Sequence, residues 1–410
     1  MLAQKSILML GGSQQQVIAI EKAKELGFRT VLCDYLPDNP GQYSADAFYL
    51  VSTTDREAVL EVAKSEGVSG VLAYSSDPAS PTAAYVAEEL GLPTNPLAAV
   101  ETMSEKHRFR AFMQDAGLPC PKSISFPVDE EPSELVQRLL ELQLPIVIKP
   151  TDSSGSKGVS VLHDVCLSTL TEAMSLAAEH SHNGTLIAEE YIERTFSNVI
   201  GGDIFVYEGR VQFWGLMSCL RDQKGNNLVP VGEKTPSGLS DKQTKSVKAT
   251  LSSLVSALGL KFGELNVEVI LGKNGTPYVL ELGSRAGGNM IPVQLSDVSG
   301  IDLVAANVLC AMGENPGSLN WESRGECCAT YVLHSNIDGV YEGIALSNTI
   351  EPHVYRLVQY LAAGATVHAF DGANRALGIA FLRFDDERQM DAILNNIDEH
   401  ICVKVAESNA

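Results

Sequence analysis

Short apolar runs alternate with amphipathic segments over the first hundred residues. The runs at 6–10 and 30–34 are typical of buried strands. Between them, residues 14–27 carry apolar side chains at helical spacing, and this segment ends at a glycine. Because the same order of strand and helix repeats to about residue 100, the pattern predicts an open parallel sheet.

A different pattern follows. A helix is predicted from about Val100, and residues 149–191 then read as strand, glycine loop, strand, helix and strand. Beyond residue 196 the strands become longer, and a turn at Glu208-Gly209 is flanked by alternating apolar residues, which indicates antiparallel hairpins. The last section is typical of a small strand-rich lobe with one helix.

These changes divide the chain into four expected parts: an N-terminal α/β domain, a small lobe with a glycine-rich loop, a large lobe, and a C-terminal lobe. Their boundaries are expected at 1–100, 101–195, 196–324 and 325–410. The expected fold class is therefore α/β and α+β.

Charge and cysteine content narrow the class of protein. The formal net charge of −21 argues against a general nucleic-acid binder or a binder of anionic membranes. Eight cysteines are scattered without CxxC spacing, which indicates buried free thiols rather than zinc or disulfides. The N-terminus lacks the pattern of a signal peptide, so we expect a soluble cytoplasmic protein.

The stretch "IVIKPTDSSGSKGV" ends an apolar strand with Lys149 and enters a loop of serine, glycine and lysine. Glycine lets backbone N–H groups approach phosphate oxygens closely, and a lysine adds positive charge. This loop alone is also compatible with an exposed hairpin tip, and Lys157 with a solvated charge at that tip.

Two glutamates, Glu268 and Glu281, lie in apolar strands joined by the turn "GKNG". Ionised carboxylates in such strands are costly unless they are paired or bind a cation, and two facing one site suit Mg²⁺. The alternative is that each points outward to water. Arg285 follows at the strand end, and "AGGN" (286–289) offers backbone N–H groups near a helix start.

Three weaker signals remain. "EEYI" (189–192) ends an apolar strand, where it can contact a heterocycle or simply end the strand. "SSDP" (75–78) follows a predicted parallel strand, so it either borders a substrate or caps a helix. Asp34 after "LGGS" suggests a dinucleotide site, but GxGxxG is absent, which disfavours NAD.

In order, these segments resemble the ATP-grasp superfamily, and within it carboxylate–amine ligases of the L-amino acid ligase type. The resemblance covers nearly the whole chain. It implies an N-terminal domain on the substrate side, two lobes enclosing ATP, and a C-terminal lid. Lys106 and Lys149 are similar to the two ATP lysines, and Glu268 with Glu281 to the carboxylates that hold Mg²⁺, or alternatively Mn²⁺.

The resemblance also implies roles for the loops. The mobile phosphate loop comprises Ser153, Ser154, Gly155, Ser156, Lys157 and Gly158. The adenine hinge comprises Glu189, Glu190, Tyr191 and Ile192, and the substrate segment comprises Arg285, Gly287, Gly288 and Asn289. Catalytic roles fall to Arg285 and Lys149.

One position departs from the family pattern Glu-x-Asn-x-Arg, because Gly283 stands where the asparagine is expected. Ser284, Asn289 or water are the candidates to replace that ligand.

The implied activity is an ATP- and Mg²⁺-dependent ligase that forms an acylphosphate, releases ADP and joins a small carboxylate, an amino acid by expectation, to an amine. A kinase that stops at a phosphorylated product and a nucleotide binder without turnover are the alternatives. The expected partners are small molecules and, as in similar proteins, a second copy of the chain in a homodimer.

Overall fold

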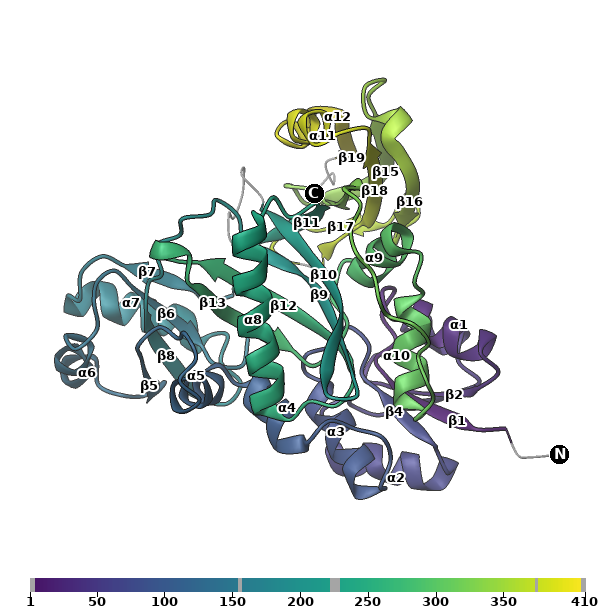
Figure 1. Ribbon diagram of the computed structural model, residues 1–410, viewed down its shortest axis with the longest axis horizontal. Coiled ribbons are helices and arrows are strands. Elements are labelled where there is room, and N and C mark those ends of the chain that lie inside the picture. Colours follow the sequence, from purple (N-terminus) through teal and green to yellow (C-terminus); the bar gives the residue numbers. More distant parts are fainter. Residues whose placement is uncertain (1–3, 154–156, 222–228, 373–374, 407–410) are drawn as a thin grey trace.

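The computed structural model describes residues 4–153, 157–221, 229–372 and 375–406. Within them the strands form four sheets, and the lobes surround a central eight-stranded sheet (Figure 1).

The N-terminal domain is built on a parallel sheet of order β3-β2-β1-β4. Its elements are β1 (Ser6–Leu10), α1 (Val17–Glu25), β2 (Arg29–Asp34), β3 (Ala47–Leu50), α2 (Arg56–Glu66), β4 (Gly70–Leu72) and α3 (Ser80–Glu89). Leu8 and Leu10 pack on the side of α2 and α3, whereas Ile7 and Met9 pack against α1 and helix α10 (Leu303–Ala311) of the large lobe. Both faces of β1 are buried, which explains its unbroken apolar run and confirms the predicted open parallel sheet.

The helix predicted from about Val100 is instead two helices, α4 (Leu97–Ser104) and α5 (Lys106–Asp115). Glu105 between them has an extended backbone, with φ −120° and ψ 112°. Because the helix is interrupted here, the Lys106 N–H does not bond within α4. It donates instead to the carbonyl of Thr151 at 2.8 Å. The interruption therefore places Lys106 beside the glycine-rich loop.

The small lobe is an antiparallel sheet of order β5-β8-β6-β7, packed against α6 and α7 (Figure 1). Its elements are β5 (Ser123–Pro127), α6 (Pro132–Leu139), β6 (Ile146–Pro150), β7 (Ser160–Leu162), α7 (Leu167–Ala178) and β8 (Thr185–Glu190). This order confirms the predicted strand, loop, strand, helix, strand segment.

The central sheet has the order β13-β12-β9-β10-β11-β14-β18-β16. Its strands are β9 (Ile200–Tyr207), β10 (Arg210–Arg221), β11 (Pro230–Thr235), β12 (Gly263–Leu271), β13 (Pro277–Gly283), β14 (Cys327–Leu333), β16 (Val354–Gln359) and β18 (Gly378–Phe384). Helix α8 (Asp241–Leu258) covers one face, and α9 (Ile291–Ser299) with α10 covers part of the other. Glu208 and Gly209 both have positive φ, 52° and 75°, as a two-residue hairpin turn requires, so the predicted β9–β10 hairpin is confirmed.

The C-terminal lobe adds a three-stranded sheet of β15 (Gly339–Leu346), β17 (Thr366–Val367) and β19 (Ile401–Ala406), with helices α11 (Glu387–Leu394) and α12 (Ile397–His400). Two helices stand where one was predicted. Short 3₁₀ turns lie at Pro40–Tyr43, Lys273–Gly275 and Glu351–His353. Strands β14, β16 and β18 join the central sheet, so that sheet continues across the expected boundary at residue 325.

All eight cysteines are free thiols, although Cys166 and Cys402 are exposed rather than buried. Among the described residues, no single helix has the length and apolar character needed to cross a membrane. One pair, α9 with α10, passes that test together but is bent by 114°.

Candidate active site

A pocket of about 920 Å³ lies between the small lobe, the central sheet and the α11–α12 segment. Most side chains predicted to bind nucleotide or metal line it: Lys106, Lys149, Ser153, Lys157, Glu189, Glu190, Tyr191, Ile192, Glu268 and Glu281. The structure thus brings together residues spread over 176 positions of sequence (281 minus 106 plus 1).

Lys149 belongs to a buried charge cluster with Glu189 and Arg110. The Glu189 carboxylate lies 2.7 Å from Lys149 Nζ and 2.9 Å from Arg110 Nε. Arg110, which is fully buried on α5, also donates to the Leu280 carbonyl of β13 at 2.9 Å. Burial opposes the ionisation of Glu189, but Arg110 and Lys149 outweigh it and lower its pKa to about 2.

This cluster shows which groups the Glu189 side chain contacts. Glu189 was assigned to the adenine hinge, but its carboxylate is committed to Arg110 and Lys149. The neighbouring Glu190 lies at the edge and accepts a bond from the Gln143 N–H at 2.9 Å. Glu190, Tyr191 and Ile192 line the pocket beside Glu189, and a hinge for adenine at this strand end stays a prediction.

The phosphate loop is described only in part, because Ser154, Gly155 and Ser156 lie outside the described residues. At its start, Lys106 Nζ donates to the Ser153 carbonyl. At its end, Lys157 is exposed, and the buried Gly158 has a φ of 69°. A Cβ on Gly158 would come within 3.1 Å of the Ala177 backbone, so both conformation and space require glycine there.

Glu268 and Glu281 are directly opposite each other in the β12–β13 ladder. Among the described residues, Arg221 lies 3.6 Å from Glu268 and Lys106 lies 3.9 Å from Glu281, both beyond normal hydrogen-bond distance. Burial raises the pKa of Glu281, and the nearby Asp77 and Glu268 carboxylates raise it further, while Lys106 opposes them. Two such carboxylates facing a nucleotide pocket have the donor chemistry that Mg²⁺ takes together with substrate phosphates.

No group of three or more metal-binding side chains occurs in the described part of the chain. A metal at Glu268 and Glu281 would therefore need ligands from phosphate and water, which is the usual arrangement for Mg²⁺ at a nucleotide.

Arg285 forms a two-point ion pair with Asp77 of the N-terminal domain. Its Nε and Nη2 lie 2.7 and 2.8 Å from the two Asp77 oxygens. Burial alone would raise the pKa of Asp77, but Arg285 holds it below the usual range. Helix α3 has no side-chain cap, so "SSDP" does not cap it. Asp77 and Arg285 both lie outside the lining of the large pocket.

Asp77 also limits the space for a side chain at position 283. A Cβ on Gly283 would lie 3.1 Å from Asp77 Oδ1 and 3.4 Å from Arg285 Nε. The side-chain position used by asparagine in the family pattern is therefore next to the Asp77 carboxylate. Ser284 is one of the candidates to replace the asparagine ligand. Its carbonyl accepts a hydrogen bond from the Ser80 hydroxyl at 3.3 Å.

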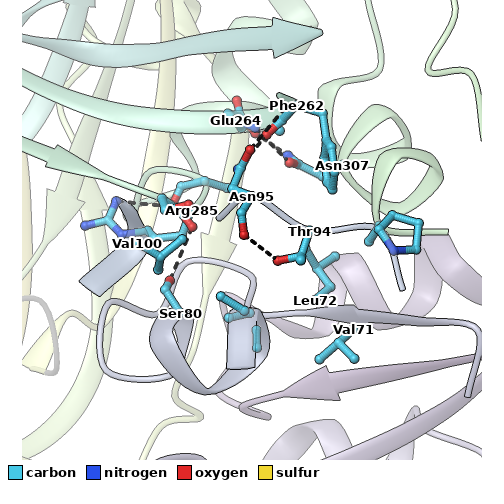
Figure 2. A pocket seen from close by; sticks show the side chains of 18 residues that line it. Val71, Leu72, Ser80, Thr94, Asn95, Val100, Phe262, Glu264, Arg285 and Asn307 are labelled. Carbon is cyan, nitrogen blue, oxygen red and sulfur yellow. Dashed lines mark hydrogen bonds between the residues drawn. The ribbon is translucent and has the colours of Figure 1, made fainter. Parts of the chain in front are cut away.

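A second, small cavity of about 80 Å³ lies behind Arg285, between the N-terminal domain and the large lobe (Figure 2). Asn95 crosses this junction: its amide donates to the Phe262 carbonyl at 2.8 Å, and its oxygen accepts from the Lys261 N–H at 2.7 Å. Within the large lobe, Asn307 donates to Glu264. The two Asn95 bonds join the N-terminal domain, which carries Asp77, to the large lobe, which carries Arg285.

The substrate segment 287–289 is held by protein acceptors. The Gly287 N–H bonds to Asp203 at 2.8 Å, and the Asn289 N–H bonds to Gln15 Oε1 at 2.6 Å. These two N–H groups, expected to face an anion, are thus already paired in this structure. Asn289 and Met290 both have positive φ, 52° and 59°, which is backbone strain of the kind that functional sites hold.

Replacing Gly283 by Asn is expected to lower the free energy of unfolding by about 1–3 kcal/mol, because the added atoms must displace Asp77. In Asp77→Ala protein the same replacement should cost at least about 1 kcal/mol less, since the obstructing carboxylate is gone. Urea unfolding of the four proteins measures this coupling. Strictly additive costs would show that Asp77 does not limit the space at Gly283.

Sequence reasoning missed Arg110 and left the role of Asp77 open. Arg110 is four residues after Lys106 on α5, so helical spacing could have placed both on one face. Asp34, the residue that suggested a dinucleotide site, accepts from the Gly12 N–H at 2.6 Å and so holds its own turn.

Comparisons with known proteins agree with this geometry. Residues 105–318 match the model of the carbamoyl-phosphate synthase L chain, ATP binding domain. A D-alanine–D-alanine ligase of Nitrosospira multiformis is 28% identical over 69% of this chain and 86% of its own length. The chain spans less than half the length of the carnosine synthases and the biotin carboxylase that it also matches.

Two solved structures share the fold. An L-amino acid ligase from Bacillus licheniformis has a TM-score of 0.77 at 21% identity, covering 98% of this chain and 99% of its own. The biotin carboxylase domain of a Hydrogenobacter thermophilus 2-oxoglutarate carboxylase, in complex with MgADP, has a TM-score of 0.77 at 16% identity, covering 98% and 91%.

The matched model covers more than half of the chain and includes most of the small and large lobes, which form two walls of the pocket. This chain belongs to the ATP-grasp family of carboxylate–amine ligases.

Proposed function

We propose that this protein joins a small carboxylate, an amino acid in our assignment, to an amine in a reaction driven by ATP. The carboxylate is activated as an acylphosphate with release of ADP, and the amine then displaces phosphate to form an amide. One observation carries the proposal: two lysines and two register-paired glutamates meet in one pocket large enough for a nucleotide and its substrates.

The nucleotide would lie between the small lobe and the central sheet. Apolar side chains of both walls, among them Val147, Val161, Ile270 and Leu280, line this part of the pocket and suit a purine ring. Lys106 and Lys149 would hold the α- and β-phosphates. Mg²⁺ fits Glu268 and Glu281, where it would neutralise phosphate charge.

Phosphoryl transfer needs positioning and charge neutralisation more than covalent catalysis by the protein. Arg285 is our choice for the group that holds the transferring phosphoryl or the tetrahedral oxyanion. Asp77 and the Ala286 carbonyl use three of its five N–H donors, which leaves two without a partner among the described residues. Loop 153–158 would close over the acylphosphate and protect it from water.

The names of the relatives support amino acids as substrates, since one is a D-alanine–D-alanine ligase and one an L-amino acid ligase. We therefore propose amino acids as both partners of the condensation.

The test is the release of ADP from ATP and Mg²⁺ over the twenty protein amino acids and other small carboxylates, singly and in pairs, with products analysed by mass. We expect ADP with particular pairs and a condensed product. ADP with one compound and a stable phosphorylated product would identify a kinase instead. AMP would contradict the acylphosphate, and ATP binding without turnover would favour a nucleotide binder.

A further inference from the structure

Glu233 is a buried carboxyl group directly behind residues that line the pocket, and the roles above leave it unused. It lies on β11, opposite Cys219 of β10, and its side chain is only 5% exposed. Its neighbours Cys219, Val231 and Lys234 all line the pocket. Oε1 accepts from the Cys219 thiol at 2.8 Å, whereas Oε2 has no hydrogen-bond partner among the described residues.

The carboxylate extends toward the proposed metal ligands. A Cβ on Gly201 of β9 would lie 2.5 Å from Cys219 Sγ and 3.0 Å from Glu233 Oε1, so the absence of a side chain at Gly201 makes room for this pair. On the other side of β9, Asn266 pairs with Asp203 and Val269 with Ile200, a register that puts Glu268 beside Gly201. One glycine thus separates the Glu233 carboxylate from the strand that carries Glu268.

The backbone of Glu233 is fixed independently of its side chain. Its N–H donates to Thr330 Oγ1 at 3.2 Å, and its carbonyl accepts from Gln294 Nε2 at 3.2 Å. Thr330 Oγ1 in turn donates to Gln294 Oε1 at 3.1 Å. The strand is therefore held by α9 and β14, and the free oxygen of the carboxylate adds nothing to that support.

A purely structural role does not account for Oε2. A buried acceptor without a partner is unfavourable unless a ligand completes it. Burial raises the pKa of Glu233 to about 8; Asp203 and Glu268 act in the same direction, and the Cys219 thiol and Arg221 oppose it. The neutral form is thus favoured in the resting protein, and a positively charged amine beside Oε2 would favour the ionised form that can accept a proton.

We propose that Glu233 binds the attacking amine of the second substrate and accepts its proton as the amide forms. This inference rests on the proposed ligase function. The amine nitrogen forms a bond to the acyl carbon, and the bond from that carbon to the phosphate oxygen breaks. Phosphate leaves with that electron pair, and the proton of the nitrogen passes to Oε2 of Glu233.

Hydroxylamine separates this step from formation of the acylphosphate. It traps acylphosphates as hydroxamates, and it is largely unprotonated at neutral pH, so it depends less on a protein base. The twenty protein amino acids serve as carboxylates, first with hydroxylamine and then in pairs. ADP, hydroxamate and amide are measured for wild type, Glu233→Gln and the control Glu342→Gln, an exposed carboxylate on β15.

In Glu233→Gln we expect amide formation to fall by about a hundredfold or more, within the range that loss of a general base produces. Hydroxamate formation should fall less than about tenfold, and Glu342→Gln should match wild type. Equal losses of amide and hydroxamate, or near-normal amide formation, would overturn the role of Glu233. Wild-type protein that forms neither hydroxamate nor ADP would overturn the ligase function itself.

Glu233→Asp provides a second test that keeps the charge at this position but draws the carboxylate back by one methylene. We expect amide formation to fall about tenfold relative to hydroxamate formation. A constant ratio of the two products in a folded Glu233→Asp protein would contradict the proposal even where Glu233→Gln does not fold.

Discussion

Glu281→Gln protein is expected to release ADP about a thousandfold more slowly than wild type and to keep its fold. Glutamine preserves the shape of the side chain but removes the negative charge that, with Glu268, would neutralise a cation at the phosphates. Because burial and neighbouring carboxylates already raise the pKa of Glu281, its removal relieves repulsion in the resting protein. The loss should therefore appear in turnover and not in thermal unfolding.

The measurement is ADP release at saturating ATP and Mg²⁺, next to a thermal unfolding curve. Glu172→Gln, which removes an exposed carboxylate on α7, is the control for the change in net charge. ADP release within tenfold of wild type from Glu281→Gln would remove Glu281 from the metal site.

Glu189→Gln is expected to lower the free energy of unfolding by about 3–5 kcal/mol, because it leaves Arg110 and Lys149 buried without their counter-ion. Glu190→Gln is a matched control one residue away, since Glu190 makes a single bond at the edge of the lobe. We expect that control to cost less than about 1.5 kcal/mol.

The cost of Glu189→Gln should depend on pH in a defined direction. The pKa of Glu189 falls from an ordinary value near 4.5 to about 2 on folding. Its stabilisation is therefore complete above about pH 4.5 and is lost as the pH falls toward 2. Urea unfolding at several pH values should show the two proteins converging in acid. A difference in stability that is constant from pH 7 to pH 3 would exclude ionised Glu189 as its source.

The sequence was sufficient for the parts of the site that neighbouring residues determine. The hairpin of β12 and β13 could be predicted from two apolar strands and a short turn, and with it the proximity of Glu268 and Glu281. Their direct pairing could not be predicted, because it depends on a register shift between Glu268 and Val269. Lys149 could be found because it ends an apolar strand next to the glycine loop.

The remaining parts depend on contacts that no local pattern contains. Asp77 and Arg285 are 208 positions apart, and their pairing depends on how the N-terminal domain packs against the large lobe. Arg110 was missed because a charged residue on a helix is normally expected at the surface, whereas here it is fully buried. The commitment of Glu189 to this arginine was hidden for the same reason.

The central sheet limits how the pocket can open. Strands β14, β18 and β16 continue the hydrogen-bonded ladder of the large lobe, so the C-terminal lobe cannot swing away as a rigid body without breaking main-chain bonds. The small lobe has its own sheet, β5-β8-β6-β7, and no strand of it belongs to the central sheet in the described chain. We therefore expect any rigid-body movement that widens the pocket to occur at the strands of the small lobe, which the central sheet does not hold.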